Sequence, residues 1–369
     1  MARSERRSEA IWVESRARWQ INVQKDGKRK TFTSSLTGKK GKHEAEAKAD
    51  KWLENKSSPR RFGDAMDAFM ADYETRVQTA TFKALETLVR NWIRPNIKPR
   101  MDLADITPAV WQVCIDAAAK AGLSKKTCAN IRGAITSFCT FCKRNRWDMD
   151  VPDTREILLP KNAPKGTRRI IQPTGMRTLF SESTIIRYEK PVECWYIHCW
   201  RLMVLTGLRR GEAAGLRWED MENENVLHIR RSINKLNIMT DGKTENAQRY
   251  VTLSPVAQDI LRNQRAMLLA HGIISPWIFP GRNGNVSDTN AIYKAWYTYR
   301  KQHGLECSLH ELRHTFISAV KSDMPEALLK QQVGHSSNTD SIGIYGHEMD
   351  GDLDLTARII DNVFKRLLG

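Results

Sequence analysis

Residues 206–218 read TGLRRGEAAGLRW and place two arginines between a turn and a predicted helix. Arg209 and Arg210 precede that helix, and Glu212 falls in its first turn. Free backbone N–H groups and the helix dipole favour anions at such a position, and a guanidinium can bind two phosphate oxygens at once. Taken alone, an ordinary basic residue at a helix end explains the pattern better than a phosphate site. Whether these arginines form a phosphate site therefore depends on the rest of the chain.

The charge balance favours a polyanionic partner. The 369 residues carry a formal net charge of +17 at pH 7, and basic residues occur along the whole chain. Nucleic acid is favoured over a membrane surface, because no basic amphipathic helix or lipidation signal is visible. The charged start MARSERRSEA lacks the apolar core of a signal peptide, and no stretch approaches the ~20 apolar residues that span a bilayer. We expect a cytoplasmic protein.

The seven cysteines do not suggest a disulfide framework. Their number is odd and they are scattered through segments with helical patterns, which fits a reducing compartment. Cys139 and Cys142 have CxxC spacing, but no second pair or histidines stand at a matching distance for zinc. We interpret the two as small apolar residues of a core helix, with a metal or redox site as the less favoured alternative. No metal and no cofactor is expected.

Length and pattern predict several domains, mainly α with small β-sheets. Residues 1–57 read as a β-hairpin, turning at Asp26-Gly27, followed by a helix. This basic module could bind a DNA groove, and a solvated basic hairpin is the alternative. Residues 62–153 contain four helical segments with cap signals between them, and residues 165–369 mix helices with short strands. The last of these segments, about 352–369, reads as an amphipathic tail helix.

Further residues in the last region are suited to phosphate chemistry. SLHELRHTF places His310 and Arg313 three apart, on one helical face where both could reach a single phosphate, with His314 pointing elsewhere. QQVGHSS contributes His335 after a glycine, and SIGIYGH sets Tyr345 between two glycines in a polar stretch. Each of these features alone is commonplace in proteins.

A lysine stands in a predicted hairpin of the same region. MTDGKTENAQRYVTL, residues 239–253, indicates two strands with Asp241-Gly242 at the turn and Lys243 at the tip. Such a lysine could protonate a leaving oxygen, although most strand-tip lysines are simply solvated. Metal-based phosphoryl transfer would need clustered acidic residues, and WEDMENEN at 218–225 has no matching partner cluster.

Taken in order, these groups resemble the catalytic set of the tyrosine recombinases, the phage integrase family. TGLRRGE is similar to the family's first arginine motif, HELRH to its HxxR box, VGH to its following histidine and IYGH to its tyrosine motif. The combination is far more specific than any one motif. The residues that carry the resemblance are Arg209, Lys243, His310, Arg313, His335 and Tyr345.

The resemblance implies a metal-free transesterification on DNA. Tyr345 would attack the scissile phosphate, forming a 3′-phosphotyrosyl bond and releasing a 5′-hydroxyl. Arg209 and Arg313 would hold the non-bridging oxygens as negative charge develops, with the TGLR register favouring Arg209 over Arg210. Because the covalent bond retains the phosphodiester energy, rejoining would need no ATP.

The remaining roles also follow from the resemblance. Lys243 would be the general acid for the 5′-oxygen, and His310 would assist the tyrosine as base. His335 would hydrogen-bond the phosphate. Glu212 matches the family's acidic residue and would orient its neighbours rather than take part in the chemistry.

The family implies a site-specific recombinase that integrates or excises a phage genome or other mobile element. It would act as a homotetramer on two duplexes of double-stranded DNA. Residues 62–153 would be the helical core-binding (SAM-like) domain, which clamps the core site together with the catalytic domain, and residues 1–57 would bind arm sites. A host DNA-bending protein and an excisionase are expected partners, and no membrane is.

The placement of the tail and the function each have alternatives. In this family, tails like 352–369 often dock on a neighbouring subunit, which we favour over packing on their own domain. A type IB topoisomerase shares the chemistry but acts as a monomer that only relaxes DNA. A basic DNA-binding regulator with a decayed cleavage site is the non-enzymatic alternative.

Overall fold

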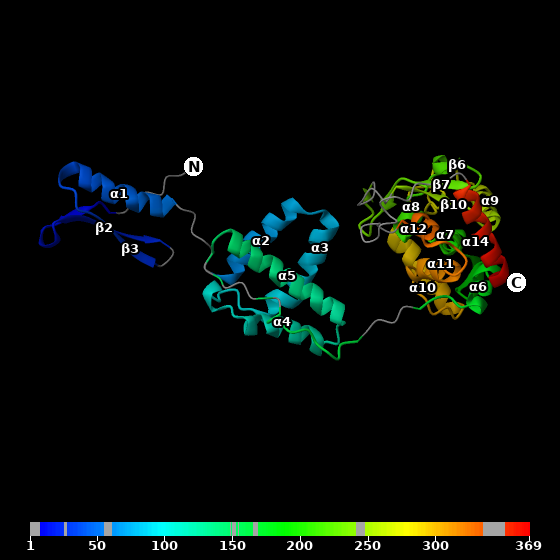
Figure 1. The fold of residues 1–369 in the computed structure, drawn as a ribbon, viewed down its shortest axis with the longest axis horizontal. Helices are drawn as coiled ribbons and strands as arrows, with labels where there is room; N and C mark the ends of the chain where they lie inside the picture. The colour runs from blue at the N-terminus through cyan, green and yellow to red at the C-terminus, as the bar shows by residue number, and fades with distance from the viewer. Residues whose placement is uncertain are drawn as a thin grey trace. The chain divides into compact units, whose positions relative to one another are not determined.

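The computed structural model describes residues 8–25, 28–54, 61–147, 149, 153, 155–164, 169–240, 248–334 and 351–369. Contacts divide the chain into two compact units, residues 1–165 and 166–369 (Figure 1). In the described residues the first unit contains two separate hydrophobic clusters and the second unit contains one. The predicted class, mainly α with small antiparallel sheets, is confirmed.

The N-terminal part of the first unit is a small sheet covered by a helix. Its elements are β1 (Ile11–Val13), β2 (Arg18–Lys25), β3 (Lys28–Ser34) and α1 (Gly38–Glu54). The strands pair antiparallel in the order β1–β2–β3. Alternation along β2 buries Ile21 and Val23, which share a core with Ala45 and Ala49 of α1. The predicted hairpin and helix are thus found; β1 was not predicted, and Asp26-Gly27 lies outside the described residues.

The rest of the first unit is mainly helical where it is described. Its helices are α2 (Phe62–Arg76), α3 (Thr79–Leu88), α4 (Pro108–Lys120) and α5 (Lys125–Arg144), with a π turn at Val89–Ile93. They coincide with the predicted helical segments. Phe62, Trp111 and Phe138 meet edge to face at the centre, with ring centroids 5.8–6.0 Å apart. Ser124 caps α5, since its Oγ accepts from the Thr127 backbone N–H at 3.2 Å.

The CxxC pair belongs to this helical core. Cys139 and Cys142 are fully buried on α5, which confirms their interpretation as core residues. Burial raises the pKa of the Cys142 thiol to about 12, so this sulfur is an inert thiol at neutral pH. All seven cysteines of the chain lie in the described residues, where they are buried and form no disulfide.

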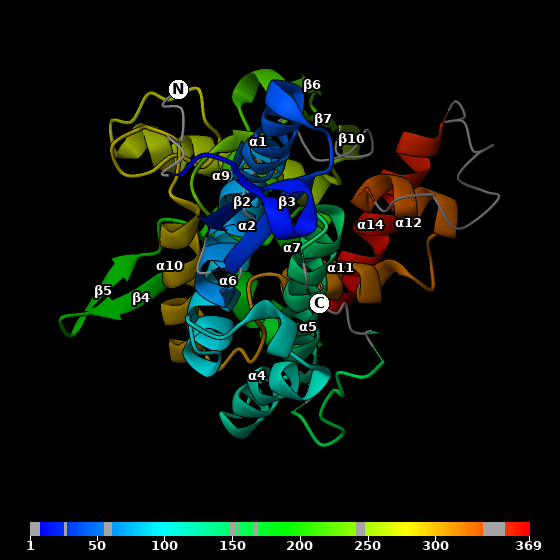
Figure 2. The ribbon, with the colours of Figure 1, turned by 90° about the vertical axis from the view of Figure 1, so that its left-hand side faces the viewer.

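The second unit combines helices with short strands. Its helices are α6 (Pro173–Ser181), α7 (Ile197–Thr206), α8 (Arg210–Ala214), α9 (Pro255–Ala270), α10 (Thr289–Gln302), α11 (Glu311–Val320), α12 (Glu326–Val333) and α14 (Asp352–Leu368). Its strands are β4 (Thr184–Arg187), β5 (Lys190–Glu193), β6 (Met221–Asn223), β7 (Val226–Ile229), β8 (Ser232–Ile233), β9 (Met239–Thr240) and β10 (Arg249–Thr252). The β4–β5 hairpin, which was not predicted, lies beside α10 (Figure 2). Within the described ranges, no helix is long and apolar enough to cross a bilayer.

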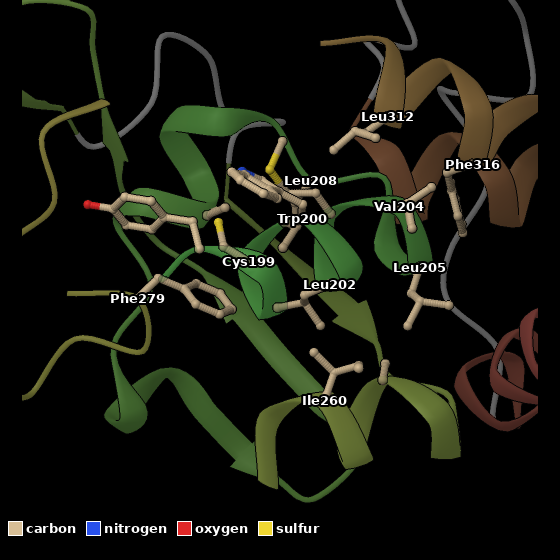
Figure 3. Packing of buried hydrophobic residues seen from close by; sticks show 14 of the residues in the cluster. Cys199, Trp200, Leu202, Val204, Leu205, Leu208, Ile260, Phe279, Leu312 and Phe316 are labelled. Carbon is tan, nitrogen blue, oxygen red and sulfur yellow. The ribbon is translucent and has the colours of Figure 1, made fainter. Parts of the chain in front are cut away.

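Helix α7 is the centre of this unit's core. All of its residues are buried, and Trp200 packs against Trp296 of α10 with ring centroids 5.0 Å apart. Figure 3 shows Val204 directed toward Phe316 of α11 on one side of α7. A helix buried on every face must be apolar throughout, which the sequence WYIHCWRLMVLT nearly is. The end of α7 is therefore rigidly fixed, and the arginine motif follows directly from it.

The strand pairing differs from the predicted 239–253 hairpin. Strand β9 pairs with β8, while β10 pairs with β7 in the sheet β10–β7–β6. The turn lies at residues 234–238, where the Asn234 N–H donates to the Ile238 carbonyl at 3.0 Å and Asn237 adopts φ +59°. The predicted pairing of residues 239–240 with 249–252 was therefore wrong. Residues Asp241–Lys243 lie outside the described residues.

The tail helix α14 packs on its own unit. Its apolar stripe, Ile360, Val363 and Phe364, is buried against the core, and the Phe364 ring stacks on Phe316 with centroids 6.4 Å apart. It lies along α6 and α11 in Figure 1, in agreement with its contacts. In the single chain its own unit covers this apolar face, as in the alternative that we weighed, and docking on a neighbouring subunit stays a prediction.

Candidate functional site

Gly207 joins α7 to the arginine motif and fixes its geometry. It adopts φ +72°, and a Cβ there would lie 2.7 Å from Cδ1 of Phe316. Its carbonyl accepts a hydrogen bond from Nη1 of Arg313 at 2.8 Å. Only glycine fits this tight left-handed turn, which brings the start of α8 beside α11.

We expect Gly207→Ala to destabilise the protein by about 1–3 kcal/mol, because a methyl group overpacks the contact with Phe316 and left-handed backbone disfavours alanine. Urea unfolding of the second unit, followed by tryptophan fluorescence, measures the change. Gly272→Ala is the matched control, since its φ is +67° but its added Cβ meets no atom within 4 Å. Equal losses in the two variants would contradict the role of the Phe316 contact.

A buried carboxylate lies between two guanidinium groups at the start of α8. Glu212 Oε1 accepts from Arg209 Nη1 at 2.7 Å and from Arg249 Nη1 at 3.2 Å. Its Oε2 accepts from the Arg209 backbone N–H at 2.9 Å and from Arg249 Nη2 at 3.0 Å. The carboxylate thus caps the helix and holds the Arg209 guanidinium in place. The Arg209 side chain stays 40% exposed and open to an incoming anion.

Arg249 was missed by the sequence prediction. It is 8% exposed and opens β10, with its side chain on the same face as the buried Val251. The signal was present in RYVTLS, because alternation with Val251 and Leu253 places Arg249 on the inward face of the predicted strand. A buried arginine needs a carboxylate or carbonyl partner, and that requirement points to a polar site.

Arg313 is a buried cation with an unused donor. It is 3% exposed, and its Nη2 has no hydrogen-bond partner among the described residues. Burial lowers the pKa of Arg313 to about 9, and the charge of Arg209 acts in the same direction, while Glu212 opposes both. The group is still protonated at neutral pH. An unpaired buried donor next to other cations is the electrostatic setting of an anion site.

Glu212 remains ionised in this setting. Burial alone disfavours its charged form, yet the hydrogen bonds and charge of Arg249, followed by those of Arg209, hold the pKa of Glu212 below its ordinary value. Three guanidinium groups then face one carboxylate. The cluster has an excess of positive charge that a phosphate diester would offset.

The predicted residues near this cluster differ in whether they belong to it. The Arg210 guanidinium lies over the Tyr293 ring, 5.8 Å from its centroid, so Arg209 and not Arg210 belongs to the cluster. His310 is exposed at the start of α11. Its ring meets that of His314 edge to face at 5.2 Å, which corrects the expectation that His314 points elsewhere.

Lys243, His335 and Tyr345 lie outside the described residues. The described chain reaches Gly334, whose carbonyl accepts from Arg209 Nη2 at 3.1 Å. The cluster thus holds the end of α12, one residue before His335 in the sequence. In the described ranges, no group of three or more His, Cys, Asp or Glu side chains is placed to hold a metal ion.

Comparisons with known proteins point to one family. Residues 171–351 match the model of the phage integrase family. A tyrosine recombinase XerC-like protein of Caldanaerobacter subterraneus subsp. tengcongensis is 23% identical over 362 residues, which cover 89% of this chain and 91% of the relative. The prophage integrase IntR of Escherichia coli is 25% identical over 175 residues, covering 41% of this chain and 43% of that protein.

Solved structures show the same fold. The Tn1549 transposon integrase in complex with transposon right end DNA superimposes with a TM-score of 0.60 at 18% identity, covering 83% of this chain and 99% of that one. The λ integrase tetramer bound to a Holliday junction gives a TM-score of 0.59 at 14% identity, covering 91% and 98%.

Proposed function

The chain belongs to the phage integrase family of tyrosine recombinases, and on that premise we propose that it is a site-specific recombinase that cleaves and rejoins DNA through a 3′-phosphotyrosyl intermediate. The observation that carries the proposal is the buried Arg313, whose Nη2 lacks an acceptor among the described residues beside the positively charged Arg209. A scissile phosphate would supply both the missing acceptor and the missing negative charge.

The two arginines bind the phosphate. Arg209, oriented by Glu212, and Arg313, held by the Gly207 carbonyl, donate to the non-bridging oxygens. Their charges stabilise the pentacoordinate phosphorus more than the ground state, because negative charge grows on those oxygens during attack. Arg313 itself needs little rearrangement, since it is buried and its Nη1 already donates to the Gly207 carbonyl.

The remaining groups move protons and bonds. The Tyr345 oxygen forms a bond to phosphorus while its proton passes to His310, and the 5′-oxygen leaves with a proton from Lys243. His335 donates a hydrogen bond to the phosphate. Rejoining reverses these steps with a 5′-hydroxyl as the nucleophile, so the number of phosphodiester bonds is conserved.

Assembly and partners extend the proposal. The protein acts in the cytoplasm as a homotetramer on two duplexes, as the λ integrase tetramer on a Holliday junction supports by analogy. Residues 1–57 bind arm sites, and residues 62–153 form the domain that clamps the core site together with residues 165–369. The net charge of +17 supports salt-sensitive binding to phosphate. Integration or excision of a phage or other mobile element uses a host DNA-bending protein and an excisionase.

The alternatives are less well supported. The matched family and relatives are integrases and recombinases, which does not favour a relaxing type IB topoisomerase. A decayed regulator would have no need to keep a buried cationic cluster intact, because buried charges destabilise a fold unless they serve a purpose.

Strand exchange tests the proposal. Two duplexes with different labels, each carrying an attachment junction of the element that encodes the protein, are incubated with the full chain. We expect recombinant products that contain both labels. Relaxation of supercoiled plasmid without any exchanged product would instead support the topoisomerase.

A further inference from the structure

Arg249 uses every nitrogen of its guanidinium within the protein. Nη1 and Nη2 donate to the two oxygens of Glu212 at 3.2 and 3.0 Å, and Nε donates to the Gln332 carbonyl at 3.1 Å. Arg313 differs, because its Nη2 has no partner in the described part of the chain. Arg249 therefore stabilises the site through contacts within the protein, whereas Arg313 keeps a donor for a ligand.

The partner of Arg249 on α12 is itself clamped. The buried Gln332 side chain accepts from the Thr252 N–H at 3.0 Å and donates to the Thr252 carbonyl at 3.2 Å. Strand β10 and the end of α12 are therefore joined by both ends of one amide and by Arg249. Gly334, two residues further, accepts from Arg209.

We propose that Arg249 is a positioning residue for DNA cleavage, acting through Glu212 on Arg209 and through the Gln332 carbonyl on the end of α12. The inference rests on the proposed function. A pair of Arg209 and Glu212 alone would be neutral, so the carboxylate would cancel the charge that a phosphate needs. Arg249 offsets the charge of Glu212 and leaves that of Arg209 available.

A DNA-free experiment tests the link between Arg249 and Glu212. The charged groups that face Glu212 in the described structure are the guanidinium groups of Arg209, Arg249 and Arg313. In Arg249→Gln, burial favours the protonated carboxyl, so the loss of Tm relative to wild type should be largest near pH 7 and shrink toward pH 5. In the Glu212→Gln background the same substitution should give a loss that does not change with pH. A pH-independent loss in both backgrounds would overturn the inference.

Cleavage within the bound complex supplies the second readout. The probe is a nicked suicide duplex that carries the attachment junction next to the gene, at saturating protein. We expect Arg249→Gln to slow covalent adduct formation by about 100-fold, with part of the rate recovered in Arg249→Lys, which retains the charge. The effects of Arg249→Gln and Glu212→Gln should be strongly non-additive, because one acts through the other. Additive effects, or no recovery with lysine, would overturn the positioning role.

Arg201→Gln is the matched control. Arg201 is 6% exposed and donates to the Leu179 and Glu182 carbonyls and to Ser183 Oγ, with no carboxylate partner among the described residues. Its loss should lower Tm while leaving the rate in the bound complex close to wild type. If Arg249→Gln does not fold, Arg249→Met, which likewise removes the charge, carries both measurements. Absence of any adduct with the wild type would contradict the proposed function. The Tm measurements without DNA would still show whether Arg249 acts through Glu212.

Discussion

Tyr345→Phe is expected to abolish the covalent protein–DNA adduct while leaving the affinity for duplex DNA unchanged. The substitution removes one hydroxyl oxygen, which is the atom that bonds to phosphorus in the proposed reaction. Phenylalanine has no atom that could form this bond, so no tyrosyl adduct can accumulate. Incubation with a nicked suicide duplex, followed by denaturing electrophoresis, measures the adduct.

The control for this variant is Tyr188→Phe. Tyr188 lies at the tip of the β4–β5 hairpin with its side chain almost fully exposed, so loss of its hydroxyl should change neither binding nor cleavage. An adduct that persists in Tyr345→Phe would mean that another residue is the nucleophile. Loss of DNA binding in that variant would mean that the hydroxyl serves recognition instead.

Arg313→Met is expected to lower the cleavage rate by about 10²–10³-fold and, at the same time, to stabilise the DNA-free protein. The first effect is the loss of a fixed donor at the developing charge on the phosphate. The second follows because a buried cation with an unpaired Nη2 is replaced by an apolar chain of similar length. Single-turnover cleavage and thermal unfolding measure the two effects.

The pH dependence of that stabilisation has a defined sign. The pKa of Arg313 is about 9 in the folded protein, below its ordinary value, mainly because of burial. Above this pH the unfolded state therefore binds more protons than the folded state. The free energy of unfolding of the wild type then rises relative to that of Arg313→Met as the pH rises through about 9. The difference in Tm should accordingly be largest at pH 7–8 and smaller at pH 10. A variant less stable than wild type at pH 7 would contradict the description of Arg313 as an unpaired cation.

Sequence patterns predicted the local features well. Helices α2–α5 follow directly from apolar residues at three- and four-residue spacing, and Arg209 with Glu212 follows from a single contiguous motif. These features depend on residues close together in the chain. The helical periodicity of the tail also predicted α14, but periodicity identifies an apolar face without identifying its partner. The structure of the single chain shows this face packed on its own unit, and docking on a neighbouring subunit stays a prediction.

The sequence did not predict which strands pair when they lie far apart in the chain. The 239–253 segment contains a strong turn signal, Asp-Gly, which favoured a hairpin there. The structure instead pairs β9 with β8 and β10 with β7, because Leu227 and Ile229 of β7 belong to the core that β10 completes. That choice is made by packing between distant segments. The role of Arg249 depends on the same pairing, so its contacts could not be read from local sequence.

The most direct test of tyrosine-based DNA cleavage is peptide mapping of the wild-type adduct formed on a nicked duplex of its own attachment junction. Protease digestion and mass spectrometry should identify one modified peptide, with the 3′-phosphate of the DNA joined to Tyr345. Attachment to another residue, linkage through a 5′-phosphate, or no adduct on a duplex that the protein binds specifically would contradict it.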